Sequence, residues 1–108
     1  MIRVCSVADV SPGAVVSADL DGTPVALAHT SDGEFFAVHD MCSHAAVALS
    51  EGEVDGCYLE CWLHGSRFDL RTGKPSGLPA TEPVATFPVE IRDGDLYVSL
   101  EPSNGVTV

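Results

Sequence analysis

The sequence has few basic residues and no long hydrophobic run. Five Lys and Arg residues stand against sixteen Asp and Glu residues, which gives a net charge of -11. Such an imbalance opposes binding to nucleic acid and to anionic lipid, so we expect partners with basic docking surfaces. The apolar runs fall far short of the roughly 20 residues that a membrane span needs. The N-terminal MIRVCSV also lacks the regions of a signal peptide, which predicts a cytoplasmic protein.

Helical periodicity is also missing, and we find no internal repeat or low-complexity segment. The one stretch that could be helical, residues 45–49, is too short for more than a turn or two. Turn signals instead recur at short intervals, which favours an antiparallel all-β fold. These signals are Ser11-Pro12-Gly13, Asp21-Gly22, Ser31-Asp32-Gly33, Asp55-Gly56, Thr72-Gly73 and Asp93-Gly94.

Segments rich in β-branched and aromatic residues lie between these turns and predict strands. They are residues 2–7, 14–18, 24–30, 34–39, 57–60, 66–70, 85–92 and 95–100. The last two, joined by Asp93-Gly94, give the clearest hairpin signal. At 108 residues we expect a single domain, 1–108, with a tail at 101–108 that frays.

Four cysteines in a chain without a secretory signal indicate thiols or metal ligands rather than disulfides. Cys5 and Cys57 fall within strand patterns, so we expect both to be buried structural residues. The other two form short mixed pairs, Cys42 with His44 and Cys61 with His64, sixteen residues apart. Both pairs fall on connections between predicted strands. The pattern therefore predicts a metal site held by two loops at one end of a β-scaffold.

Three kinds of metal centre can be compared with these pairs. A structural zinc site accepts two cysteines and two histidines, but its usual spacing groups like with like. A blue-copper site needs one cysteine and an axial methionine such as Met41, which leaves a cysteine over. A mixed two-iron cluster takes two thiolates on one iron and two imidazoles on the other, so one of each from each loop suits it.

The segments CSH at 42–44 and CWLHG at 61–65, followed by SRFDLRTGKP, resemble the Rieske ferredoxin motif. The resemblance extends over nearly the whole chain. It is greatest to the ferredoxins of bacterial aromatic ring-hydroxylating dioxygenases and to actinobacterial relatives found beside Suf iron–sulfur assembly genes. It implies one [2Fe-2S] cluster and an antiparallel Rieske-type β-sandwich, with a smaller cluster-binding subdomain of two loops at about residues 41–83.

The resemblance also implies a role for each ligand. Cys42 and Cys61 would hold the inner iron, and His44 and His64 the outer, more exposed iron. The exposed edge formed by His44 and His64, with Trp62 beside it, would be where electrons leave. Trp62 could either serve as a docking aromatic or pack over the base of its loop.

The resemblance to Rieske proteins also allows several other positions to be interpreted. Val47 and Leu63 stand where the Rieske proteins of cytochrome bc complexes have a disulfide, so that clamp is absent. His29 and His39 match no motif position and are expected to be ordinary strand residues. The loop with Pro75, Pro79 and Pro83 resembles the segment that covers the cluster in this family, and we expect it to shield the site.

Three residues after the second cysteine are expected to tune the cluster. Ser66 matches a serine that donates a hydrogen bond to cluster sulfur, and Phe68 stands where high-potential relatives have a tyrosine. Such donors raise the potential, so we expect a value in the lower half of the range of roughly -150 to +300 mV. Gly65 would let backbone amides approach the cluster, because it has no Cβ.

No nucleophile or acid–base pair is indicated, so we expect an electron carrier and not an enzyme. It would pass one electron at a time from a flavin-dependent ferredoxin reductase to a terminal non-haem iron oxygenase. An alternative is a protein that senses redox state or iron supply, or that assists iron–sulfur assembly. A structural zinc module is the third possibility.

Overall fold

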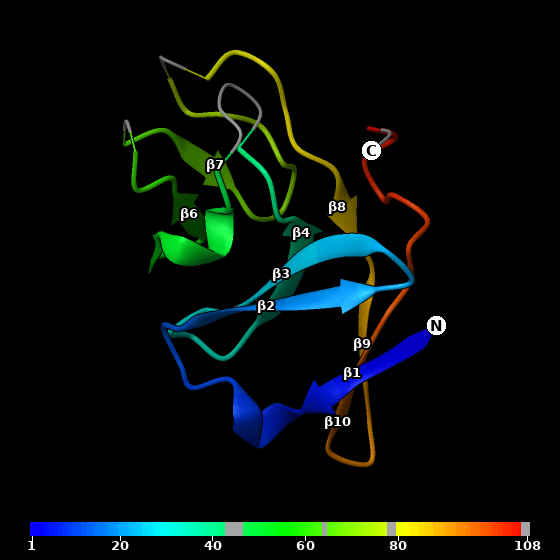
Figure 1. Ribbon diagram of the computed structural model, residues 1–108. Helices are drawn as coiled ribbons and strands as arrows, with labels where there is room; N and C mark the ends of the chain where they lie inside the picture. The colour runs from blue at the N-terminus through cyan, green and yellow to red at the C-terminus, as the bar shows by residue number, and fades with distance from the viewer. Residues whose placement is uncertain (43–46, 64, 78–79, 107–108) are drawn as a thin grey trace.

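The computed structural model describes residues 1–42, 47–63, 65–77 and 80–106. Within them, ten strands form three antiparallel sheets (Figure 1). This confirms the all-β prediction. The described residues contain no helix that is long and apolar enough to cross a membrane.

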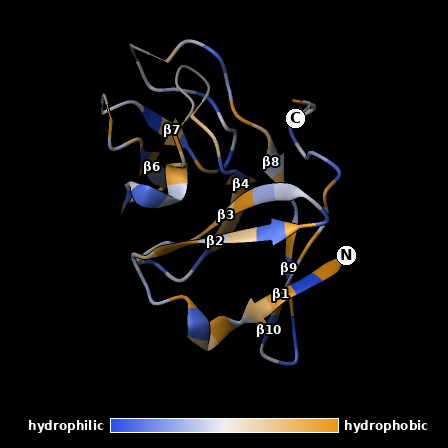
Figure 2. Ribbon diagram, in the orientation of Figure 1, coloured by the Kyte–Doolittle hydropathy of each residue, from blue (hydrophilic) through white to orange (hydrophobic). Residues whose placement is uncertain are grey.

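The basal sheet has the order β1-β10-β9 and is built from β1 (Ile2–Ser6), β10 (Asp95–Val98) and β9 (Val89–Arg92). The β9–β10 turn is the predicted hairpin. Asp93 and Gly94 both have positive φ, 50° and 79°, which a two-residue type I′ turn requires. Figure 2 shows this turn as hydrophilic. β1 ends one residue earlier than predicted, because Ser6 caps the short 3-10 helix η1 (Val7–Asp9).

The central sheet has the order β2-β3-β4-β8, from β2 (Val15–Leu20), β3 (Thr23–His29), β4 (Phe35–His39) and β8 (Thr86–Phe87). β2 and β3 are joined by the predicted Asp21-Gly22 turn, again with positive φ at both residues. β3 and β4 are antiparallel neighbours, and His29 and His39, predicted to be strand residues, are the last residues of each.

β3 contributes to both hydrophobic cores, as does β4 through Ala37 and Val38. Its residues Val25, Ala26, Leu27 and Ala28 are all 0% exposed. Because successive side chains point to opposite faces of a sheet, Val25 and Leu27 pack in one core while Ala26 and Ala28 pack in the other.

The basal core lies between the basal and central sheets. Its buried residues are Val10, Leu20, Val25, Leu27, Ala37, Ala85, Phe87, Leu96 and Val98. The site core lies on the other face of the central sheet. Its buried residues are Ala26, Ala28, Val38, Cys42, Leu49, Leu59, Cys61, Phe68, Leu70, Ala80 and Val84.

The chain changes sheet at Pro88. The sequence predicts one strand over 85–92, but the structure divides it into β8, which pairs with β4, and β9, which pairs with β10. Proline has no N–H to donate to a ladder, so it interrupts the pairing at this point. The single-strand prediction was wrong for that reason.

The site sheet has the order β5-β6-β7 and covers the site core. It is built from β5 (Glu53–Asp55), β6 (Tyr58–Glu60) and β7 (Arg67–Asp69). β5 was not predicted, because three residues are too few to show an alternating pattern. Before it comes the 3-10 helix η2 (Leu49–Glu51), which begins where the predicted helical turn was expected to end.

The C-terminal tail is docked up to Val106, which corrects the prediction that residues 101–108 fray. The N–H of Ser103 donates to the carbonyl of Thr86 at 2.7 Å, and the side chain of Asn104 forms four hydrogen bonds. Val106 packs against the basal core. Residues 107–108 lie outside the described part of the chain.

Candidate metal centre

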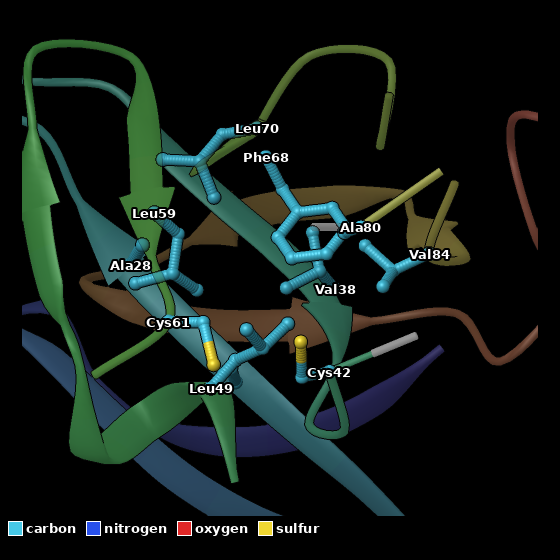
Figure 3. Close-up of a cluster of buried hydrophobic side chains, with 11 residues drawn as sticks. Ala28, Val38, Cys42, Leu49, Leu59, Cys61, Phe68, Leu70, Ala80 and Val84 are labelled. Atoms are coloured by element: carbon cyan, nitrogen blue, oxygen red, sulfur yellow. The ribbon is translucent and has the colours of Figure 1, made fainter. Parts of the chain in front are cut away.

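Cys42 and Cys61 lie on two loops that meet over the site core. The first loop follows β4, and the second joins β6 to β7. Cys42 is 3% exposed and Cys61 is 0% exposed. Figure 3 shows both sulfur atoms at one end of the same buried cluster, with Leu49 beside them. Two elements far apart in the sequence thus bring both thiol groups to one place.

A buried carboxylate fixes the end of the first loop. Asp40, 7% exposed, accepts hydrogen bonds from the N–H of Ser50 at 2.7 Å and from its hydroxyl at 2.6 Å. Within the loop, the N–H of Cys42 donates to the carbonyl of Val47 at 3.0 Å. Sequence reasoning missed Asp40 and Ser50. The available signal was an acidic residue directly after an apolar strand, where it needs a partner.

The second loop is a tight turn closed on both sides. The N–H of Cys61 donates to the carbonyl of Ser66 at 2.6 Å, and the N–H of Gly65 donates to the carbonyl of Cys61 at 3.0 Å. Gly65 has φ +72°, a conformation that other residues adopt at a cost. In the described part of the chain, no atom beyond its two sequence neighbours lies within 4 Å of a Cβ built there. Glycine is therefore needed for its backbone conformation, whereas close approach to a cluster stays a prediction.

Ser66 and Phe68 follow this turn and are both inside the molecule. Ser66 is 1% exposed, and its hydroxyl oxygen accepts a hydrogen bond from the N–H of Ala80 at 3.2 Å. The hydroxyl therefore ties the loop of Pro75 and Pro83 to the second cysteine loop, and it retains its own hydrogen for donation. Phe68 is 0% exposed and lies in the site core between β6 and the loop that carries Ala80 (Figure 3).

The two histidines of the predicted ligand set, His44 and His64, lie outside the described residues. Among the described residues, no three His, Cys, Asp or Glu side chains come together as a metal site. The described geometry therefore places the two cysteines of the predicted ligand set and not the two histidines.

Comparison with known proteins identifies the chain. The family model described as "Rieske [2Fe-2S] domain" matches residues 1–88. The chain belongs to the Rieske [2Fe-2S] family. It is 42% identical over 100 residues, 92% of each chain, to the 3-phenylpropionate/cinnamic acid dioxygenase ferredoxin subunit of Escherichia coli (strain K12). It is 41% identical to the biphenyl 2,3-dioxygenase ferredoxin component of Rhodococcus jostii (strain RHA1), covering 99% of this chain and 97% of the relative.

Solved Rieske structures have the same fold. The ferredoxin of carbazole 1,9a-dioxygenase from Nocardioides aromaticivorans IC177 superimposes with a TM-score of 0.86 at 33% identity, over 91% of this chain and 95% of that one. A chain in the "complex of reduced oxygenase and oxidized ferredoxin in carbazole 1,9a-dioxygenase" gives 0.88 at 37% identity, with 94% of each covered. The Rieske-type fold predicted from the sequence is thereby confirmed. Neither comparison supports a link to Suf genes.

The cysteines present fit the [2Fe-2S] cluster that defines this family. Neither Cys42 nor Cys61 is in a disulfide, and both lie inside an apolar core. Iron–sulfur clusters are held by deprotonated cysteines, and a bound metal supplies the positive charge that a buried thiolate needs. The zinc alternative is wrong, because the family's cofactor is a [2Fe-2S] cluster.

Three large apolar residues of the two loops are exposed. Met41 is 45% exposed, Trp62 is 53% exposed and Leu63 is 40% exposed. We call these three residues the apolar rim. Trp62 therefore does not pack away over the base of its loop. The rim adjoins both cysteines of the predicted ligand set, since Met41 precedes Cys42 and Trp62 follows Cys61.

The remaining cysteines, Cys5 and Cys57, and His39 are not among the residues of the site core. Cys5 is partly buried against the basal core, and burial raises the pKa of its thiol. Cys57 is also only partly buried and lines a surface cavity of about 250 Å³ together with Arg71. Both cysteines were expected to be buried, but both are only partly buried, and their structural role stays a prediction. Burial lowers the pKa of His39, which favours its neutral form.

Every arginine is paired with a carboxylate. Arg3 contacts Asp95 at 3.1 Å, and the other three pairs are Arg67–Asp55, Arg71–Asp69 and Arg92–Glu90. Hydrogen bonds from Arg71 hold the pKa of Asp69 below its usual value. The charge of these four cations is thus cancelled locally, and the excess negative charge is left to act at the surface.

Proposed function

We propose that this protein is the electron-carrying ferredoxin component of an aromatic ring-hydroxylating dioxygenase system, and not itself an enzyme. The observation that carries this is the pair of buried cysteines on two adjoining loops, in a chain that matches ferredoxin components of dioxygenases almost end to end. When bound, the cluster accepts and releases one electron. The cytoplasmic location expected from the sequence stays a prediction.

The chain's own residues would hold, bury and present the redox centre. Cys42 and Cys61 would ligate the inner iron, and His44 and His64 the outer one. Leu49, Leu59 and Phe68 are all 0% exposed and would keep water from the cysteine side. An apolar shell of this kind lowers the dielectric around the cluster and so tunes its potential.

The apolar rim supports docking at the same end of the molecule. Met41, Trp62 and Leu63 expose large side chains beside the ligand loops, and exposed apolar patches commonly mark interaction sites. A solved structure of a related ferredoxin is a complex with its oxygenase. We propose that the oxygenase and a flavin-dependent reductase both approach this rim, close to the His44 and His64 edge.

Acidic side chains would steer these partners. On the site sheet, Glu53 is directly opposite Glu60, and Asp55 is on the same strand as Glu53. Like charges placed opposite each other destabilise a sheet, so this arrangement favours a role in attraction. Partners with basic docking surfaces would then associate faster at low salt.

Electron transfer to a purified dioxygenase and from its reductase tests the carrier proposal. The rate should fall as salt rises, and E53Q/E60Q should flatten that dependence. The matched control D19N/D21N removes two charges from the β2–β3 turn and should leave it unchanged. Reduction without any oxygenase turnover, in a protein whose partner binding changes with cluster state, would instead favour the sensor alternative.

We also propose that Ser66 donates a hydrogen bond to cluster sulfur and that Phe68, which has no hydroxyl, provides none. A donor stabilises the reduced state, and about 1.4 kcal/mol corresponds to 59 mV for one electron. Protein-film voltammetry should show a fall of tens of millivolts for Ser66→Ala and a rise for Phe68→Tyr, given donors worth about 1 kcal/mol. Potentials that do not move in either variant would contradict the assignment.

A further inference from the structure

The described residues of the loop between β7 and β8 form a closed unit, which we call the proline loop (residues 73–77 and 80–84). Gly73 and Val84 form its neck, because the N–H of Val84 donates to the carbonyl of Gly73 at 2.9 Å. The loop reaches the metal centre through Ala80 and Val84, both of which are buried in the site core with Cys42 and Cys61.

A single side chain from the C-terminal tail joins both ends of this loop. The Nδ2 of Asn104 donates to the carbonyl of Thr72 at 2.9 Å and to the carbonyl of Val84 at 2.8 Å. Its Oδ1 accepts from the N–H of Thr86 and of Val106, both at 3.2 Å. An amide has two hydrogens and two lone pairs, so every hydrogen-bonding site of Asn104 is used.

Gly73 supports this interpretation independently. It has φ +78°, and a Cβ built on it would lie 2.1 Å from the carbonyl oxygen of Val84 and 2.7 Å from Nδ2 of Asn104. Any other residue at position 73 would push the neck and the amide apart. The absence of a side chain at Gly73 thus leaves room for the Asn104 amide to reach the neck of the loop.

The loop in turn holds Ser66. The N–H of Ala80 donates to the hydroxyl oxygen of Ser66, which is 1% exposed and lies at the end of the second cysteine loop. A hydroxyl that accepts from a fixed direction has fewer directions left for its own hydrogen. The position of Ala80 therefore helps to decide where Ser66 donates.

We propose that Asn104 is a positioning residue of the redox centre: it fixes the neck of the proline loop and, through Ala80, the orientation of the Ser66 hydroxyl. The effect on the cluster rests on the proposed tuning by Ser66, whereas the effect on the loop does not. Asn104 lies in the tail that sequence reasoning expected to fray, so no sequence motif indicates it.

Asn104→Asp distinguishes the donor role of the amide from its acceptor role. The carboxylate can still accept from Thr86 and Val106, but it cannot donate to Thr72 and Val84. Ser103→Ala is the matched control on the same tail, since its hydroxyl hydrogen-bonds to Thr86 of β8 and to no described residue of the proline loop. Both are measured as cluster-loaded proteins.

Hydrogen exchange and voltammetry give the result. We expect N104D to speed amide exchange at Ala80 and Val84 and to lower the cluster potential, while S103A does neither. The double variant N104D/S66A should have the potential of S66A alone, because both changes act through one hydroxyl. Should N104D bind no cluster, N104S removes the whole amide, its Oδ1 acceptor included, without adding charge. It should likewise speed exchange at Ala80 and Val84 and lower the potential relative to S103A.

Three outcomes would overturn the proposal: unchanged exchange at Val84 in N104D, equal effects from S103A, or additive potential shifts in the double variant. If S66A alone leaves the potential unmoved, the tuning by Ser66 fails, and exchange then decides the loop role by itself. Neither measurement uses a reductase or an oxygenase, so failure of the carrier function is scored separately.

Discussion

The basal and site halves of this molecule are built by different means. In the basal half, which comprises the basal and central sheets, every strand except the two-residue β8 has four to seven residues. These strands pair around an apolar core, with two-residue turns at Asp21-Gly22 and Asp93-Gly94. In the site half, the three strands have three residues each. There, hydrogen bonds between side chains and backbone groups distant in the sequence connect the loops. Asp40, Ser66 and Asn104 form such bonds.

This difference shows where local sequence rules are sufficient. A type I′ hairpin is specified by its turn residues and by the alternation on either side of it. The site half is specified by contacts such as Ser66 with Ala80 and Asn104 with Thr72, which are 14 and 32 residues apart. In a cluster-binding protein the metal adds further folding free energy at that same end.

Removing a ligand should separate the two halves most strongly. Cys61→Ser should abolish the [2Fe-2S] absorption and the bound iron, because a neutral hydroxyl is a poor substitute for a thiolate. Hydrogen exchange should then rise in β5–β7 and much less in β2, β3 and β10. Cys57→Ser, in the same half but outside the site core, should retain the cluster. A variant C61S with full iron content would refute the ligand assignment.

Two buried leucines provide a matched comparison of the cores. Leu59 and Leu96 are both 0% exposed, the first in the site core and the second in the basal core. Truncation of either to alanine should cost about 2–5 kcal/mol of unfolding free energy. Only L59A should speed iron release to a chelator under conditions where both variants are folded. Equal release rates would show that the cores are not separate in this respect.

The Asp40–Ser50 contact should have an intermediate effect. Ser50→Ala removes one of the two hydrogen bonds that Asp40 accepts from Ser50, which should cost about 1–2 kcal/mol because the carboxylate stays buried. Thermal unfolding and iron release should both shift. The exposed Ser31→Ala serves as the control and should shift neither; if S50A behaves like S31A, the first loop does not depend on this contact.

The smallest effect should come from the Arg71–Asp69 pair. Because the pKa of Asp69 is lowered in the folded state, its stabilisation is present above the ordinary carboxyl pKa and is lost as pH falls through the folded value. Asp69→Asn should cost about 0.5–1 kcal/mol at neutral pH, and the difference should close in acid. Urea unfolding against pH measures this, with Asp93→Asn as the control. A difference that persists in acid would mean that charge is not the cause.

Much of the fold could be predicted from the sequence, because its signals are local. The Asp21-Gly22 and Asp93-Gly94 hairpins and the two cysteines at one end all follow from turn residues and spacing. β5 and the break at Pro88 could not be predicted with the same certainty, since each depends on which sheet a short segment joins. His44 and His64 stay predictions from the motif.

The polar contacts of the site were missed for a related reason. Ser50 and Asn104 are common surface residue types, and nothing in their immediate sequence indicates a distant partner. For Asp40 the one signal is an acidic residue directly after an apolar strand. Their importance follows from the burial of Asp40 and from the four hydrogen bonds of the Asn104 side chain, which only the three-dimensional arrangement reveals. The tail was expected to fray because sequence offered no measure of the Asn104 contacts.

β3 works as a partition between two environments that can be modified independently. Since Val25 and Leu27 face one core and Ala26 and Ala28 the other, an engineer could repack the first pair for heat resistance without altering the surroundings of the iron. The converse also holds, because Ala26 and Ala28 pack in the site core together with both cysteines. In a designed carrier, thermal stability and reduction potential could therefore be adjusted separately, by substitutions at alternate residues of one strand.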